Sequence, residues 1–73
     1  MNNIAERLRR ARMTSRLTQR QAAQKIGYSV AAMRNWENGN TSPTADAVKK
    51  LIDLYNCSAD YIFGLAEYKR RRI

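Results

Sequence analysis

The side chains of this 73-residue chain that could do chemistry are mostly cations, and they are unevenly distributed. Fourteen Lys and Arg outnumber six Asp and Glu, which gives a formal net charge of +8. Residues 1–20 hold six Arg and one Glu, residues 21–68 hold four bases and five acids, and residues 69–72 add four cations. A nearly neutral middle between basic ends is typical of proteins that bind a polyanion, nucleic acid first and an anionic lipid surface second. A solvated surface without such a partner is the alternative.

Residues for catalysis or metal binding are scarce. The chain has no His and a single cysteine, Cys57, so it offers neither an internal disulfide nor a Cys/His zinc site. The few carboxylates are not arranged as a dyad. A chain of this size buries only about 60% of the surface that it exposes when unfolded, which is too little for a deep cleft. We therefore expect no enzyme activity, no cofactor, no metal and no small-molecule substrate.

The sequence also predicts where the protein resides. It contains no run of 18 apolar residues and no apolar stretch of signal-peptide length near its start. A lone cysteine fits a reducing compartment. We expect a cytoplasmic protein with no membrane partner.

Gly, Ser and Thr residues predict where helices begin and end. Each glycine follows a segment with helical apolar spacing, the position at which Gly most often ends a helix: Gly27, Gly39 and Gly64. Hydroxyl side chains suited to N-caps precede such segments: Thr18, Ser29, Thr44 and Ser58. Thr18 and Gln21 match a capping box. With an opening helix from about Asn3 to Ser15, the sequence predicts an all-α fold of five short helices.

Two of these helices are separated by only Gly27 and Tyr28. Two short helices joined by a tight turn form a helix-turn-helix, whose second helix can lie in the major groove of DNA. The next helix, from Thr44 to about Asn56, has a single apolar stripe formed by Val48, Leu51, Ile52 and Tyr55.

Residues 17–40 resemble a known family. Their sequence, L-T-Q-R-Q-A-A-Q-K-I-G-Y-S-V-A-A-M-R-N-W-E-N-G-N, is similar to the helix-turn-helix of the Cro and lambda-repressor-like transcriptional regulators, the XRE family. The similarity continues in S-P-T-A-D-A-V-K-K-L-I-D-L-Y-N and S-A-D-Y-I-F-G. It implies a compact five-helix, lambda-repressor-like DNA-binding domain in residues 1–66. Residues 67–73 match nothing in the family and are either an arm on the DNA backbone or a disordered basic tail.

The resemblance also implies a DNA-binding surface. Gln19 would brace a phosphate, while Arg34 and Asn35 of the recognition helix could pair with guanine and adenine. Val30 and Ala31 would contact thymine methyls. The full expected set is Thr18, Gln19, Tyr28, Ser29, Val30, Ala31, Arg34, Asn35, Asn38 and Asn40. Arg34 could instead reach a phosphate, and Val30 and Ala31 could be plain helix surface.

Other positions carry structural expectations. Met33 and Trp36 should point inward with Ala23 and Ile26. The resemblance implies an internal ion pair between Arg12 and Glu37, and a buried Cys57. Two positions depart from the family pattern: Ala22, where relatives usually have Leu, and Arg16, where a left-handed Gly or Asn often ends the first helix. We expect repacking near Ala22 and a strained or reshaped turn at Arg16.

These features together predict a transcriptional regulator, most simply a repressor that binds a palindromic operator in double-stranded DNA as a homodimer. One recognition helix reads too few base pairs to discriminate against a genome. The expected dimer interface draws on Leu54, Ile62, Phe63 and Leu65, although Ile62 could belong to the monomer core. The alternatives are an antitoxin or restriction-modification control protein of the same fold, and a protein-interaction module that binds acidic surfaces.

Overall fold

The computed structural model describes residues 4–64 of the chain, and these residues form five α-helices. The helices are α1 (Ile4–Thr14), α2 (Gln19–Ile26), α3 (Val30–Asn38), α4 (Ala45–Tyr55) and α5 (Ala59–Ile62). No strand occurs within residues 4–64. The predicted all-α, helix-turn-helix architecture is confirmed.

The predicted capping residues are the ones that the structure uses. Thr18 Oγ1 accepts a hydrogen bond from the Gln21 amide at 3.0 Å, and the Gln21 side chain accepts from the Thr18 amide at 2.9 Å, which completes the capping box. Ser29, Thr44 and Ser58 each accept from the amide three residues further on. Each cap satisfies a backbone donor that the first helical turn leaves without a partner.

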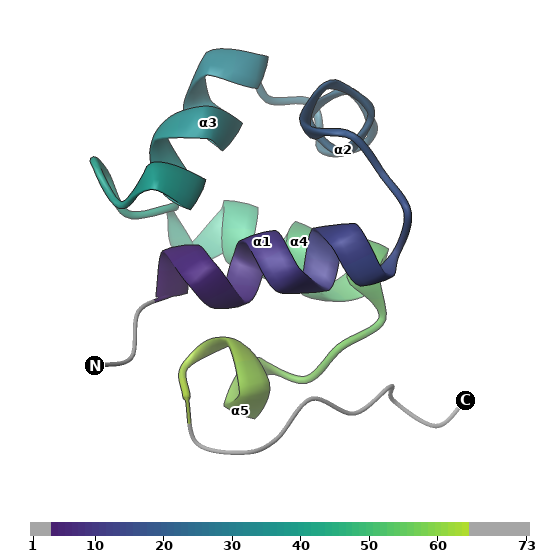
Figure 1. Cartoon of the computed structure of the whole chain (residues 1–73), viewed down its shortest axis with the longest axis vertical. Helices are drawn as coiled ribbons and strands as arrows, with labels where there is room; N and C mark the ends of the chain where they lie inside the picture. The colour runs from purple at the N-terminus through teal and green to yellow at the C-terminus, as the bar shows by residue number, and fades with distance from the viewer. Residues whose placement is uncertain (1–3, 65–73) are drawn as a thin grey trace.

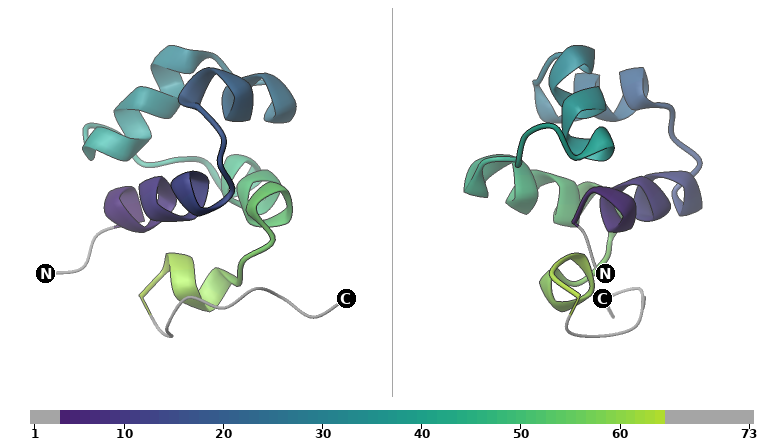
Figure 2. Two further views of the ribbon diagram at one scale, coloured as in Figure 1. Left: turned by 45° about the vertical axis from the view of Figure 1, so that its right-hand side comes forward. Right: turned by 60° about the vertical axis from the view of Figure 1, so that its left-hand side comes forward.

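The helices lie at three levels. Figures 1 and 2 show α2 and α3 on one side of the molecule, α1 and α4 in the middle, and α5 on the opposite side. Gly27 makes the sharp corner between α2 and α3 with a φ of 79°, a left-handed conformation that Gly adopts without a steric penalty. The helix-turn-helix therefore forms one side of the molecule, supported from beneath by α1 and α4.

The core is built from the inward faces of all five helices. Met33 is fully buried, Trp36 is 6% exposed, and both belong to the same buried cluster as Ala23 and Ile26, as predicted. Cys57 is fully buried, which confirms that expectation. Ala22 is also buried completely. Because two large side chains anchor α3 from below, its opposite face is left for other contacts.

The turn after α1 contains the left-handed residue that the family pattern requires, although an arginine occupies it. Arg16 has a φ of 60°, and the amide of Leu17 donates to the carbonyl of Arg12 at 3.3 Å. A residue with a Cβ atom is strained in this conformation by about 1 kcal/mol. The turn thus keeps the usual shape at an energetic cost.

Candidate nucleic-acid interface

The outer face of α3 has the exposure that a recognition helix needs. Ala31, Arg34 and Asn35 are exposed, and Val30 is half-buried at the first turn. The Nδ2 group of Asn40 lies 3.5 Å from Oδ1 of Asn35, so the loop after α3 approaches this face. The end groups of Arg34 and Asn35 carry seven N–H donors and one acceptor oxygen, and α3 presents them side by side.

Polar and cationic groups surround this face. Thr18, Ser29, Asn38 and Asn40 are exposed. The hydroxyls of Thr18 and Ser29 already accept a backbone hydrogen bond, so each retains its own proton for donation. Three further cations at the surface form no ion pair within residues 4–64: Arg16, Arg20 and Arg34.

Tyr28, expected to contact DNA, is engaged within the chain. Its hydroxyl donates to Oδ2 of Asp46 at 2.8 Å and lies 3.2 Å from Oγ1 of Thr44. Its ring meets the Trp36 ring edge-on, with centroids 5.2 Å apart. The hydrogen bond from Tyr28, and then that from Lys50, lowers the pKa of Asp46. Tyr28 thus fastens the helix-turn-helix corner to the start of α4, a role that sequence reasoning missed because its partners lie far along the chain.

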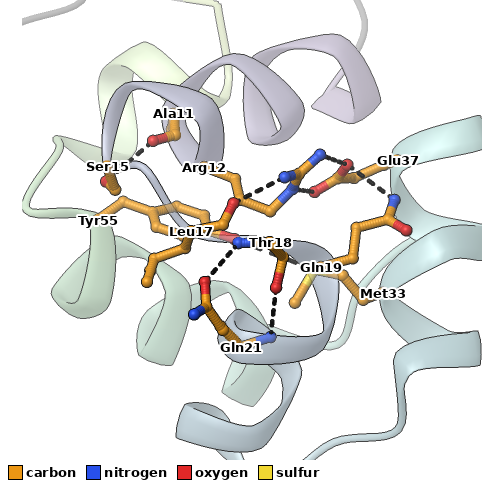
Figure 3. A network of polar contacts seen from close by, with 10 residues as sticks. All are labelled: Ala11, Arg12, Ser15, Leu17, Thr18, Gln19, Gln21, Met33, Glu37 and Tyr55. Atoms are coloured by element: carbon orange, nitrogen blue, oxygen red, sulfur yellow. Dashed lines mark hydrogen bonds and ion pairs between the residues drawn. The ribbon is translucent and has the colours of Figure 1, made fainter.

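A buried ion pair joins α1 to α3, as the resemblance implied (Figure 3). Arg12 donates from Nε to Oε2 of Glu37 at 2.7 Å and from Nη2 to Oε1 at 3.0 Å. The side chains of Arg12 and Glu37 are 12% and 1% exposed. The hydrogen bond to Glu37 raises the pKa of Arg12. This paired fork geometry is the strong form of the interaction and the expected ion pair is confirmed.

Two more groups complete the network in Figure 3. Arg12 Nη1 donates to the carbonyl oxygen of Leu17 at 2.8 Å, just before α2 begins. Gln19, the first residue of α2, donates from Nε2 to Oε1 of Glu37 at 3.1 Å. The expected phosphate-bracing residue is therefore tied to the buried ion pair, a link that nothing in the sequence indicated.

The residues expected at a dimer interface lie in different surroundings. Ile62 is fully buried, so the alternative of a core residue is correct and Ile62 offers no surface to a partner. Leu54 is half-buried and lines a hollow beside Gln24 and Lys25 of α2. Phe63 is 46% exposed and lines a different groove. Leu65 lies outside the described residues.

The groove beside Phe63 is apolar and has a volume of about 390 Å³. Its floor and walls include Ile4, Pro43, Val48, Ile52 and Phe63, and the charged residues Lys49 and Asp53 also line it. The sequence placed Val48 and Ile52 only in the core stripe of α4. A helix whose apolar stripe is wider than its contact with the core leaves the outer part of that stripe uncovered.

Two features are absent from the described residues. None of the helices in residues 4–64 has the length and apolar character that crossing a bilayer requires. The same residues contain no group of three His, Cys, Asp or Glu side chains placed to hold a metal ion.

Comparisons with known proteins agree on one family. A family model described as a helix-turn-helix domain matches residues 3–61. The chain is 33% identical over 69 residues to the HTH-type transcriptional regulator ImmR of Bacillus subtilis (strain 168), which covers 94% of the chain and 54% of that protein. It is 37% identical over 62 residues to the uncharacterized HTH-type transcriptional regulator YobD of the same organism, covering 85% of the chain and 55% of YobD.

A third relative is a phage protein. The chain is 34% identical over 61 residues to the cryptic phage CTXphi transcriptional repressor RstR of Vibrio cholerae serotype O1 (strain ATCC 39315 / El Tor Inaba N16961), covering 84% of the chain and 54% of RstR. The chain thus spans about half the length of the curated relatives that it matches. No solved structure gives a significant match.

Proposed function

Because the chain belongs to the helix-turn-helix domain family, we propose that it is a transcriptional regulator that binds double-stranded DNA in a sequence-specific manner. The observation that carries this proposal is the outer face of α3, which presents Arg34 and Asn35 on a helix anchored by Met33 and Trp36. The name of the relative RstR supports repression. Occupancy of an operator would block RNA polymerase sterically, with no catalytic step.

Within this proposal, base reading and backbone contact belong to different side chains. Arg34 pairs with a guanine and Asn35 with an adenine in the major groove, while Val30 and Ala31 lie against thymine methyls. Phosphates receive hydrogen bonds from the side chains around α3: Thr18, Gln19, Ser29, Asn38 and Asn40. Tyr28 supports the corner between the helices, and its contact with DNA stays a prediction.

The proposed domain organisation follows the resemblance. Residues 1–66 form the DNA-binding domain, and the cations of residues 69–72 act on the DNA backbone by charge. Residues 69–72 lie outside the described residues.

We assign the apolar groove beside Phe63 to a second copy of the chain. Phe63 lines the groove and is 46% exposed, so this face offers apolar surface that the same face of a second copy could cover around a two-fold axis. Lys49 and Asp53 carry opposite charges along the same groove and so complement each other across a two-fold axis. Leu54 is not part of this surface. To enter successive major grooves, the two recognition helices of such a dimer need to lie about 34 Å apart.

Sedimentation of the free protein and of its complex with DNA tests the dimer. Phe63→Asp should shift the chain to monomer and weaken specific binding, because a charge replaces the apolar side chain. Met13→Asp is the matched control, since Met13 is 54% exposed on α1 and does not line the groove. Equal effects of the two substitutions, or one chain per specific site, would contradict the proposed interface.

The salt dependence of duplex binding tests the DNA partner. If a dimer neutralises about eight phosphates, the logarithm of the association constant should fall against the logarithm of salt concentration with a slope of about −7. A slope shallower than about −2 would instead favour the protein-interaction module.

A further inference from the structure

We propose that Glu37 is a positioning residue for DNA binding, which holds the amide of Gln19 in the orientation that contacts a phosphate. This inference rests on the proposed DNA-binding function and adds to it a residue that touches no DNA. Glu37 is 7% exposed and lies near the end of α3, behind the interface. Gln19 is the third donor to this carboxylate, after the two N–H groups of Arg12, and it is the one that belongs to the expected interface.

The orientation of Gln19 follows from the chemistry of its partner. A carboxylate at this position only accepts hydrogen bonds, so the NH₂ end of the Gln19 amide must face Glu37 and its oxygen must face away. The amide nitrogen carries two hydrogens. With one hydrogen on Oε1 of Glu37 at 3.1 Å, the rotation of the amide is restrained and the second hydrogen stays free to donate. A phosphate oxygen can only accept, so this second hydrogen is the one that it needs.

Glu37 itself is unable to swing away. Arg12 donates hydrogen bonds to both carboxylate oxygens of Glu37, at 2.7 and 3.0 Å. Arg12 also donates to the carbonyl oxygen of Leu17 at 2.8 Å, which holds its guanidinium group in place. The hydrogen bonds that hold the Glu37 carboxylate beside Gln19 therefore join three parts of the chain: α1, the turn before α2, and α3. A partly exposed Gln without an anchor samples several rotamers and loses that freedom on binding DNA. Because Glu37 already restricts the rotamers of Gln19 in the free protein, less conformational entropy is lost when DNA binds.

A double-mutant cycle in the full chain separates positioning from stability. Glu37→Asp keeps a carboxylate for Arg12 but withdraws it by one methylene from Gln19. We expect Glu37→Asp and Gln19→Ala each to weaken duplex binding about tenfold per protomer, the size of one charge-assisted hydrogen bond. The two together should weaken binding no more than Gln19→Ala alone, since without the Gln19 amide Glu37 has no phosphate donor left to orient. Affinities are compared for the folded fraction, measured in parallel by unfolding.

Arg20→Ala is the matched control for this cycle. Arg20 neighbours Gln19 at the start of α2, is exposed, and forms no ion pair within residues 4–64. Its attraction to phosphate acts through charge and does not pass through Glu37. Its effect should add to that of Glu37→Asp and lower the salt slope by about one unit. Additive effects of Gln19→Ala and Glu37→Asp, with wild-type duplex binding intact, would overturn the positioning role while leaving the proposed function standing.

A measurement on the unmodified protein keeps the inference testable if Glu37→Asp fails to fold. Nuclear magnetic resonance of the Gln19 side-chain amide in the free protein should show two well-separated proton signals and a restricted amide. Gln24, which is exposed on the same helix, is the internal reference. A Gln19 amide as mobile as that of Gln24 would refute preorganisation. Loss of duplex binding by the wild-type chain would refute the proposed function itself.

Discussion

Arg12→Met should remove most of the stability of the domain, because it leaves the charge of Glu37 buried without its partner. The substitution abolishes two hydrogen bonds to Glu37 and one to Leu17, around a carboxylate side chain that is 1% exposed. Breaking one side of such a pair typically costs about 3–5 kcal/mol. A chain of 73 residues has a total free energy of unfolding of about 4–11 kcal/mol. We therefore expect a loss of at least about 12 °C in Tm.

Urea unfolding followed by the fluorescence of Trp36, the single tryptophan of the chain, measures this loss. Arg10→Met on the same helix is the control: Arg10 and Glu6 are 3.8 Å apart, with side chains 63% and 62% exposed. Exposed pairs of this kind contribute less than about 0.5 kcal/mol. Equal losses for the two arginines would refute the reasoning.

Four further substitutions test three separate parts of the structure. Arg34→Ala or Asn35→Ala should cost about 1–3 kcal/mol of binding free energy at particular base pairs, measured on operator variants. An unchanged sequence preference would mean that the base-reading positions on α3 are wrongly assigned. The pKa of Asp46 is lowered chiefly by the hydrogen bond from Tyr28. The ionised Asp46 carboxylate therefore stabilises the fold above its unfolded-state pKa, and this stabilisation is lost as the pH falls through its folded-state pKa. Tyr28→Phe should reduce the loss of stability below about pH 5, measured by unfolding experiments. Arg16→Gly should raise the free energy of unfolding by about 0.5–1 kcal/mol by relieving the left-handed strain, and a loss of stability would show that the arginine makes a contact of greater value.

Features set by local chemistry were predictable from the sequence. A cap depends on a hydroxyl and an amide three residues apart, so Thr18, Ser29 and Thr44 could be assigned without knowledge of the fold. The inward direction of Met33 and Trp36 followed from helical spacing in the same way. The ion pair between Arg12 and Glu37 needed the resemblance to known regulators, because 25 residues separate its partners.

Features that depend on packing between distant segments were not predictable. The hydroxyl of Tyr28 meets Asp46 only because α4 passes beneath the corner between α2 and α3. Leu54 and Phe63 are apolar residues near the end of the chain, yet they line different hollows. Ile62 is buried because α5 packs against α1 and α4. The DNA-contacting roles of Arg34 and Asn35 remain predictions.

Selection of bound duplexes from a random pool by the full chain tests the central claim most directly, since it measures binding, sequence preference and symmetry together. DNA binding through α3 of a homodimer predicts one enriched sequence with two-fold related half-sites, whose centres are separated by about 10–10.5 base pairs or a multiple of that spacing. Recovery of duplexes without a common sequence, or no retention of duplex DNA at all, would contradict the proposal that the chain is a sequence-specific DNA-binding regulator.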